Sequence, residues 1–391
     1  MKLKSALILL LASLICAPSI YAQQPPYRIQ NRGVWVSVFS AKRVLYSKPA
    51  ADELLKTCKD AGINQIYLQV YQSGKAFYNS RISDQAKYRE ILASSGIDTV
   101  DYLLQEAKKQ GIKVFAWVNL LSIGQNNSAD IIRKLGPSVL TRDQYMRPCG
   151  RNNQNESDKY YLREDQIFLE PGDQRVVKYL ASIVEEIITR YPSLSGVHLD
   201  YARYPMTVPF TPGSRFANYG LNYGYGKENV NRFKEWTGLD PFKGLNKDKH
   251  FSLWDDWRRQ QVTNLIRTIS RRVKEKSPEM LVSSAVVPSA ERAYSSMFQD
   301  WPGWLEDQTV DYVVLMNYTL DNQLAKEIVV SSLCHRRQGK VFAGMGLFLM
   351  KDDPAALREQ YKAISQLSPD GIVFFAYDDI TPDVITYLRE H

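Results

Sequence analysis

The 391-residue sequence is poor in the residues that build disulfide frameworks and metal clusters. It holds four histidines, and its four cysteines are far apart without a Cys-x-x-Cys pair. These counts exclude a disulfide scaffold and disfavour a histidine-rich metal hydrolase. One long-range disulfide is the alternative for Cys58, Cys149 and Cys334, but we expect buried thiols. We predict that the protein needs no metal and no cofactor.

Signatures of several other function classes are also missing. The sequence has no His-Glu-x-x-His helix, no Gly-x-Ser-x-Gly elbow and no phosphate-binding loop. Clusters of Lys and Arg interleaved with aromatic residues are absent, so we predict no nucleic-acid partner despite a formal net charge of +8. The mild basic excess either suits an anionic polymer such as a cell-wall glycan or is scattered surface charge.

Long hydrophobic runs are absent, apart from one near the start of the chain. The run ALILLLASLI at residues 6–15 follows a short basic segment and precedes the small residues of APSIYAQQ. This pattern predicts a signal peptide over residues 1–22 rather than a stable membrane span, for which the run is too short. We therefore expect an exported protein of the periplasm or cell envelope. A lipoprotein is disfavoured because the bulky Ile15 precedes Cys16.

The rest of the chain alternates between strand-like and helix-like patterns. Short runs rich in β-branched and aromatic residues occupy 32–38, 63–71, 113–120, 196–203, 280–287, 310–318, 341–347 and 371–377. Helical patterns separate them, and several end at a glycine just before the next strand. Such alternation predicts a parallel sheet, and eight units predict an α/β fold of the (β/α)8 TIM-barrel type over residues 28–391. An open doubly wound sheet is the alternative, but no glycine-rich phosphate loop follows its first strand.

Two connections in this predicted barrel are long. They cover residues 121–171 after the third strand and 205–256 after the fourth. Loops that follow the carboxyl ends of barrel strands form the catalytic face, and loops of this length are usually functional or disordered. Their aromatic residues either stack on sugar rings or pack the loops onto the barrel.

The fourth strand carries the leading catalytic candidate, in the run GVHLDYARYP. Alternation along a strand places His198 and Asp200 on the side of the barrel axis. A carboxylate near the rim is costly unless it is paired or functional, so we predict a catalytic role for Asp200. Arg203 either keeps Asp200 ionised and binds substrate or only braces the loop. His198 is either a substrate-binding residue or a core histidine.

The other strand ends supply polar and aromatic groups that suit a polyol ligand. We predict substrate binding for Gln69, Tyr71, Trp117, Asn119, Asn317, Tyr318 and Tyr377. Glycoside hydrolysis usually needs a second carboxyl group, and Glu170 and Asp378 are the candidates. Glu170 precedes a Pro-Gly pair, so the alternative to catalysis is that it only forms a turn. For Asp378 the alternative is a helix-capping or turn role.

The order of these motifs resembles that of one known family. RGVWVSV, GINQIYLQVYQSGKAFYNS, GIKVFAWVN, YLREDQIFLEPGDQRVVKYL, GVHLDYARYP and VDYVVLMNYT are similar to the motifs of the glycosyl hydrolase-like 10 family. The resemblance covers nearly all of the chain from Arg32 onward. It implies an exported bacterial TIM barrel related to glycosidases, acting on peptidoglycan strands stripped of their stem peptides. It also implies that Asp200 is the central acid, but it departs at Glu170, where relatives more often carry Asp or Asn.

A second, narrower resemblance concerns the MNY run at residues 316–318. It is similar to the sixth strand of chitinase-like barrels, which implies that Tyr318 assists the acetamido group of the substrate. No Asp-x-x-Asp-x-Asp-x-Glu stretch accompanies it, so this role is an analogy.

We therefore predict an exported glycoside hydrolase that uses Asp200 for acid/base catalysis. Its expected substrate is a polysaccharide, peptidoglycan or a related N-acetylated glycan. If the N-acetyl group of the substrate is the nucleophile, one protein carboxylate suffices. Two alternatives stay open: a non-catalytic glycan-binding envelope protein on the same barrel, and a deacetylase or lyase, which needs a metal cluster or a Tyr or His base near Asp200.

Overall fold

The computed structural model describes residues 29–391 except 151–163, 208–220, 244 and 246. The predicted signal peptide therefore lies outside the described residues. No helix in the described part of the chain is long and apolar enough to cross a membrane. Cys58 and Cys149 are buried thiols as predicted, whereas Cys334 is exposed.

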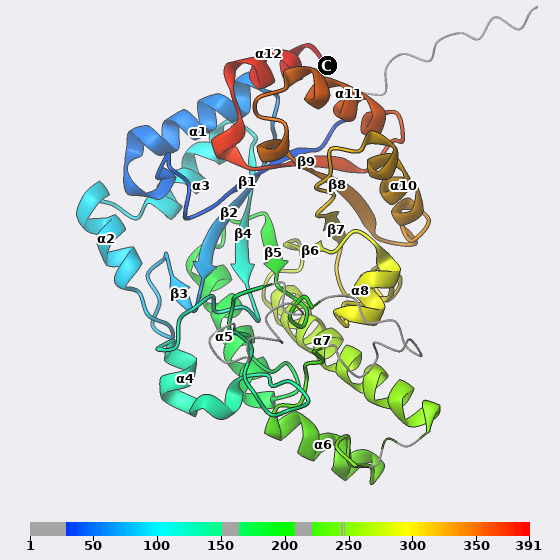
Figure 1. Ribbon diagram of the computed structural model, residues 1–391. Helices are drawn as coiled ribbons and strands as arrows, with labels where there is room; N and C mark the ends of the chain where they lie inside the picture. Colours follow the sequence, from blue (N-terminus) through cyan, green and yellow to red (C-terminus); the bar gives the residue numbers. More distant parts are fainter. Residues whose placement is uncertain (1–28, 151–163, 208–220, 244, 246) are drawn as a thin grey trace, which may run out of the picture.

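Eight parallel strands close into a barrel, which confirms the (β/α)8 prediction over the open sheet (Figure 1). Strand β1 pairs with both β2 and β9, and this double pairing closes the sheet. A short strand β3 (Lys75–Ala76) adds antiparallel to β2. In order around the barrel the eight strands are β1 (Arg32–Val36), β2 (Gln65–Gln72), β4 (Lys113–Asn119), β5 (Gly196–Asp200), β6 (Leu281–Val286), β7 (Tyr312–Leu315), β8 (Lys340–Gly346) and β9 (Gly371–Phe375).

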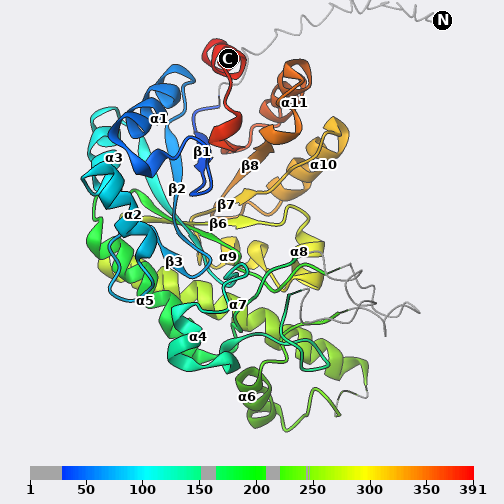
Figure 2. The same ribbon diagram turned by 60° about the vertical axis from the view of Figure 1, so that its left-hand side comes forward.

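Helices between successive strands form the outer layer of the barrel (Figure 2). The larger ones are α1 (Lys48–Asp60), α3 (Thr99–Lys109), α5 (Gln174–Arg190), α7 (Asp248–Lys276), α10 (Asn322–Leu333), α11 (Pro354–Ser365) and α12 (Pro382–Glu390). Shorter helices in the connections are α2 (Ala86–Ser95), α4 (Asp130–Leu135), α6 (Lys227–Thr237), α8 (Ala290–Ser296) and α9 (Trp301–Glu306).

Helix α5 shows why these segments become helices on the barrel wall. Its apolar residues recur every three or four positions, so Val176, Leu180, Ile183 and Ile187 form one buried stripe. Asp173 caps its first turn by accepting a hydrogen bond from the Arg175 backbone N–H. The helix is thus held by burial of one face against the sheet.

The inside of the barrel is filled with aromatic side chains. Alternation along the strands sends one set of residues to the axis, while the other set, such as Val197 and Leu199 of β5, packs against the helices. Because the interior is packed, a ligand approaches the barrel axis from an end, and in this fold from the carboxyl ends of the strands. The inward set is Trp35, Tyr67, Phe115, Trp117, Tyr312, Val314, Phe342 and Val373.

Helix α7 is much longer than the strand that follows it. Its 29 residues span about 43 Å, whereas the six residues of β6 span about 20 Å. The helix begins at Asp248, within the long connection predicted over residues 205–256. Its first turns project with α6 beyond the carboxyl ends of the strands (Figures 1 and 2). We call α6 and residues 248–258 the helical arm.

Candidate active site at the carboxyl ends of the strands

Asp200 occupies the last position of β5 and faces the barrel axis. Its residue surface is 8% exposed, so the carboxylate lies at the mouth of the barrel but is largely removed from water. The Trp117 indole N–H donates to Oδ2 at 3.0 Å, and the backbone N–H of Tyr201 donates to Oδ1 at 2.7 Å. Two donors therefore fix the orientation of the carboxyl group, and each oxygen keeps a further lone pair.

The surroundings of Asp200 raise its pKa. Burial raises the pKa of Asp200 above its ordinary value, and the negative charge of Glu164 acts in the same direction. The Tyr201 N–H, the Arg203 guanidinium and the Trp117 indole oppose this effect without cancelling it. A carboxyl group whose pKa is raised keeps its proton to a higher pH, as a general acid requires.

Arg203 does not form the predicted ion pair with Asp200. Its guanidinium instead makes a two-pronged ion pair with Glu164, at 2.6 Å and 2.9 Å, and donates to the Tyr204 carbonyl. Strand β5 ends at Asp200 because Tyr201 turns into the left-handed region at φ 52°, and this turn redirects the chain before Arg203. Arg203 acts on Asp200 only at longer range, and its direct partner is a residue that the sequence reading missed.

Glu164 is that missed residue. Although burial opposes the change, the Arg203 guanidinium and the Met206 N–H lower the pKa of Glu164 below its usual range. Asp200 and Glu164 thus form a pair of carboxyl groups whose environments push their pKa values apart, a pattern typical of acid/base sites. Glu164 and Arg203 are 39 positions apart, so no local pattern in the sequence predicts that they pair.

Glu170, one of the two candidates for the second catalytic carboxylate, is buried where the two long connections meet. Its Oε1 accepts from the Tyr204 hydroxyl at 2.6 Å and from the Gly172 N–H. Its Oε2 accepts from the Thr141 hydroxyl at 2.9 Å and from the Gly226 N–H. With four donors and no exposed surface, the carboxylate faces protein rather than a ligand, so we reassign Glu170 to organising the loops.

His198 is a core histidine rather than a residue that meets substrate. Its Nε2 accepts a hydrogen bond from the Trp35 indole at 3.1 Å, and its Nδ1 bonds the Ser283 hydroxyl at 2.9 Å. Burial lowers the pKa of His198 to about 3, so the ring is neutral at ordinary pH. Both nitrogens are occupied by protein one layer below Asp200, which corrects the predicted role in substrate binding.

A β-bulge separates the two residues predicted on β2. Strict alternation puts Gln69 and Tyr71 on one face, but the register of β2 against β4 shifts between them. Gln69 pairs with the inward Trp117, whereas Tyr71 pairs with the outward Val118. Tyr71 therefore packs into the outer core, where burial raises its pKa and Tyr179 is its neighbour, and it does not reach the site.

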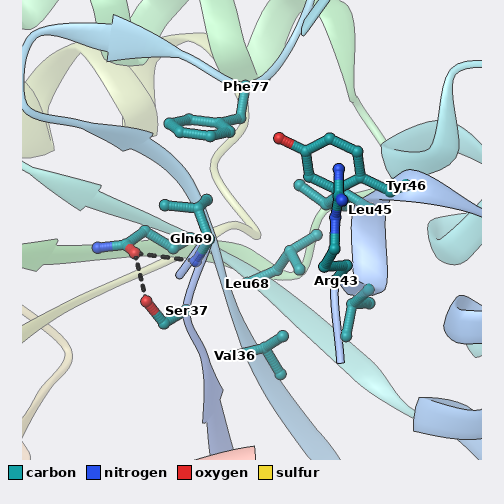
Figure 3. Close-up of a pocket in the computed structure, with 10 residues that line it drawn as sticks. Val36, Ser37, Arg43, Leu45, Tyr46, Leu68, Gln69 and Phe77 are labelled. Carbon is teal, nitrogen blue, oxygen red and sulfur yellow. Dashed lines mark hydrogen bonds between the residues drawn. The ribbon is translucent and has the colours of Figure 1, made fainter. Parts of the chain in front are cut away.

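Gln69 joins three strands at the rim. Its Oε1 accepts from the Ser37 hydroxyl and the Val38 N–H, and its Nε2 donates to Asn119 Oδ1 at 3.2 Å. Figure 3 shows Gln69 with Ser37 beside a small cavity, whose other labelled lining residues include Leu45, Leu68 and Phe77. Asp200 is not among the residues that line this cavity, so we place the candidate substrate site at the mouth instead.

Three further predicted residues lie apart from Asp200. Asn317 is buried and donates to the Ala325 carbonyl of α10, and Tyr377 packs outward under the Lys42 ammonium, 3.9 Å from its ring centre. Asp378 is exposed on the rim and accepts from the Ser40 hydroxyl at 2.6 Å. Strand β7 ends at Leu315 and β9 at Phe375, so alternation no longer governs where these side chains point.

Aromatic rings from the ends of β7, β8 and β9 and from β1 form one wall of the mouth. Tyr318 stacks on Phe375 with ring centres 5.4 Å apart, and its edge meets Trp35 and Phe348. Burial raises the pKa of Tyr318, and the neighbouring Asp200 carboxylate adds to the effect. Phe348 and Phe375 were not predicted as site residues, although Phe348 directly follows one strand-like run and Phe375 lies within another. Flat apolar rings beside an acid suit the carbon–hydrogen face of a sugar.

The chain matches a known family of proteins. A model of the glycosyl hydrolase-like 10 family matches residues 30–341. The chain belongs to this family. The family assignment agrees with the resemblance predicted from the motifs. Among the described residues, no group of His, Cys, Asp and Glu side chains gathers in a way that could hold a metal ion.

Curated relatives of this chain are named glycosyl hydrolases. Glycosyl hydrolase DigH of Escherichia coli K12 is 26% identical over 342 residues, covering 78% of this chain and 70% of the relative. Glycosyl hydrolase YngK of Bacillus subtilis 168 is 22% identical over 312 residues, covering 73% of this chain and 54% of the relative. The chain thus spans about half the length of YngK.

Solved structures of TIM-barrel glycosidases share the fold. Alpha-L-fucosidase isoenzyme 2 from Paenibacillus thiaminolyticus superposes with a TM-score of 0.54 at 11% identity, covering 92% of this chain. The chain spans about half of that enzyme, 48%. An identity this low shows the fold alone. Family and fold together support a glycoside hydrolase with a carbohydrate substrate.

Proposed function

We propose that this glycosyl hydrolase-like 10 protein is an exported enzyme that cleaves glycosidic bonds in peptidoglycan strands, with Asp200 as the general acid. The observation that carries the proposal is the carboxyl group of Asp200. It is buried at the end of β5, held by Trp117 and Tyr201, and lies beside the ring of Tyr318. Export to the periplasm or cell envelope rests on the pattern of residues 1–22, and the mild basic charge suits an anionic polymer.

In the proposed mechanism, protonated Asp200 gives its proton to the glycosidic oxygen. The bond between that oxygen and the anomeric carbon breaks, and the leaving saccharide departs with a new hydroxyl group. The carbonyl oxygen of the substrate's own acetamido group forms the new bond to the anomeric carbon. The Asp200 carboxylate then takes a proton from the water that opens this ring, which restores the acid.

The proposal of an internal nucleophile rests on how the nearby carboxylates are bonded. Both oxygens of Glu164 bind Arg203, and both oxygens of Glu170 are saturated by buried donors. In this proposal the Glu164 charge is committed to the Arg203 ion pair and Glu170 is buried among protein donors, so the nucleophile comes from the substrate. Tyr318, next to Asp200, then has the role of orienting the acetamido group. A thiazoline analogue of an N-acetylhexosamine imitates the cyclised intermediate, and we expect it to inhibit competitively.

The deciding experiment is incubation of the purified protein with intact and with peptide-stripped peptidoglycan, followed by mass analysis of soluble products. We expect saccharide fragments from the peptide-stripped polymer. Retained binding without fragments from either polymer would favour the non-catalytic glycan-binding alternative. Loss of acetyl groups without chain cleavage would favour a deacetylase.

We expect Trp117→Phe to lower kcat/KM about tenfold, because a hydrogen bond to a charged group contributes about 1.5–3 kcal/mol. The indole also lowers the pKa of Asp200, so its loss raises that pKa and extends activity to higher pH. The measurement is a pH–rate profile. Tyr312→Phe, which removes a hydroxyl bonded to Tyr67 inside the barrel, is the matched control and should leave the profile in place.

Glu164→Gln should move the alkaline limb of activity to lower pH. The Glu164 charge raises the pKa of Asp200, so removing it lowers that pKa, and the newly unpaired Arg203 lowers it further. Since the protonated acid is the active form, it is then lost at a lower pH. Glu186→Gln is the control, because Glu186 lies on α5 and its carboxylate accepts hydrogen bonds from the Tyr78 and Ser80 hydroxyls. A limb that stays in place or moves upward would contradict the coupling.

A further inference from the structure

The helical arm carries two stacked tryptophan rings, one exposed and one half-buried. Trp236, at the end of α6, is 65% exposed, which is unusual for so large a side chain. Its ring lies 5.5 Å from that of Trp257 on α7, centre to centre, with an angle of 25° between the planes. One face of α6 packs against α7. It carries Asn229, Phe233 and Trp236, which recur at helical spacing.

The ring beneath Trp236 is fixed in place. The Trp257 indole N–H donates to Asn229 Oδ1 at 2.7 Å, which sets the ring orientation. The Arg232 guanidinium lies 5.4 Å from the Trp257 ring centre and is itself held by the Gly172 carbonyl and by Gln261. A platform of this kind is ordered before a ligand arrives, so binding costs little side-chain entropy.

The arm is hydrogen-bonded to the segment of chain that also carries Glu164. Glu170 accepts from the Gly226 N–H at the start of α6, and Arg232 donates to the Gly172 carbonyl. The same segment of chain holds Glu164, the partner of Arg203 next to Asp200. The helical arm that carries the platform projects beyond the carboxyl ends of the strands, the end of the barrel at which Asp200 lies (Figure 2).

The flanks of the platform favour a saccharide over a lipid surface. Lys234 forms an ion pair with Asp240 at 2.9 Å, and Glu235 beside Trp236 is exposed. Against an anionic lipid surface, the carboxylates beside the platform would face lipid phosphates, which is unfavourable. A sugar ring, by contrast, offers carbon–hydrogen groups to the aromatic face and hydroxyl groups to charged side chains of either sign.

We propose that the Trp236–Trp257 platform binds a sugar ring of the glycan chain at a distance from the cleaved bond. The platform holds polymeric substrate against the face that carries Asp200. The identity of the polymer rests on the proposed function. Binding itself does not require that Asp200 be catalytic.

The test compares full-length variants in the background Asp200→Asn, with peptide-stripped peptidoglycan sacculi as the probe in a sedimentation assay. Trp236→Ala should weaken binding about three- to tenfold, the loss that corresponds to one aromatic stacking contact. Trp236→Phe should restore part of it. Leu92→Ala, which trims an exposed apolar side chain of α2 on another side of the barrel, is the control and should bind as the parent does.

Activity assays separate this proposal from the proposed function. With Asp200 intact, Trp236→Ala should slow release of fragments from the polymer several-fold and leave cleavage of short saccharides unchanged. Binding that depends on Trp236, without cleavage by the parent protein, would support the platform and refute the hydrolase. Unchanged binding in Trp236→Ala, or a dimer in solution that this substitution dissociates, would overturn the platform and leave the hydrolase assay unaffected.

Discussion

Asp200→Asn is expected to lower kcat on peptide-stripped glycan by about 10²- to 10⁴-fold while leaving glycan binding within about twofold. General acid catalysis contributes about 10²–10⁴-fold, and an amide of the same size has no proton of suitable acidity to give. The side-chain carbonyl can accept from only one of the two donors, the Trp117 indole and the Tyr201 N–H. Thermal unfolding measured alongside activity shows that the variant is folded.

The leaving group provides a sharper test of the same role. A substrate with a good leaving group, such as an aryl glycoside, needs little help from an acid, so Asp200→Asn should lose far less activity on it. Asp378→Asn is the matched control, because Asp378 is an exposed rim carboxylate bonded to Ser40. We expect that variant to keep activity within about tenfold of the parent. Full activity in Asp200→Asn would remove this residue from the mechanism.

Glu170→Ala is expected to lower the free energy of unfolding by about 3–5 kcal/mol. The substitution leaves the Tyr204 and Thr141 hydroxyls and the backbone N–H groups of Gly172 and Gly226 without an acceptor in a buried site. Urea denaturation measures the change. The exposed Glu275→Ala is the control and should lie within about 0.5 kcal/mol of the parent.

Glu170→Gln adds a pH readout to this prediction. Burial raises the pKa of Glu170 in the folded protein above its unfolded value. The stability linked to its proton is therefore complete below the unfolded pKa and is lost as pH rises through the folded pKa. The parent protein should lose stability relative to Glu170→Gln over that window. Unchanged stability in Glu170→Ala together with lost activity would instead return Glu170 to a catalytic role.

The sequence determined the strands of the barrel and the placement of its acid. Burial of one face of each segment is a local pattern, so the eight strands and most of the intervening helices can be read from apolar spacing. The same period of two places His198 and Asp200 on the axis side of β5, because no irregularity interrupts this strand. Trp117 and Gln69 face inward for the same reason.

Only the tertiary structure decided which polar residues meet at the site. A bulge turned Tyr71 outward, and the early ends of β7 and β9 freed Asn317 and Tyr377 from the alternation. The partners of Arg203 and Glu170 are long-range contacts, set by how two connections fold over the barrel. Hydrogen bonds between segments far apart in the chain leave no periodic trace in the sequence. The three-dimensional arrangement was therefore needed to replace Glu170 with Glu164 as the carboxylate that influences Asp200.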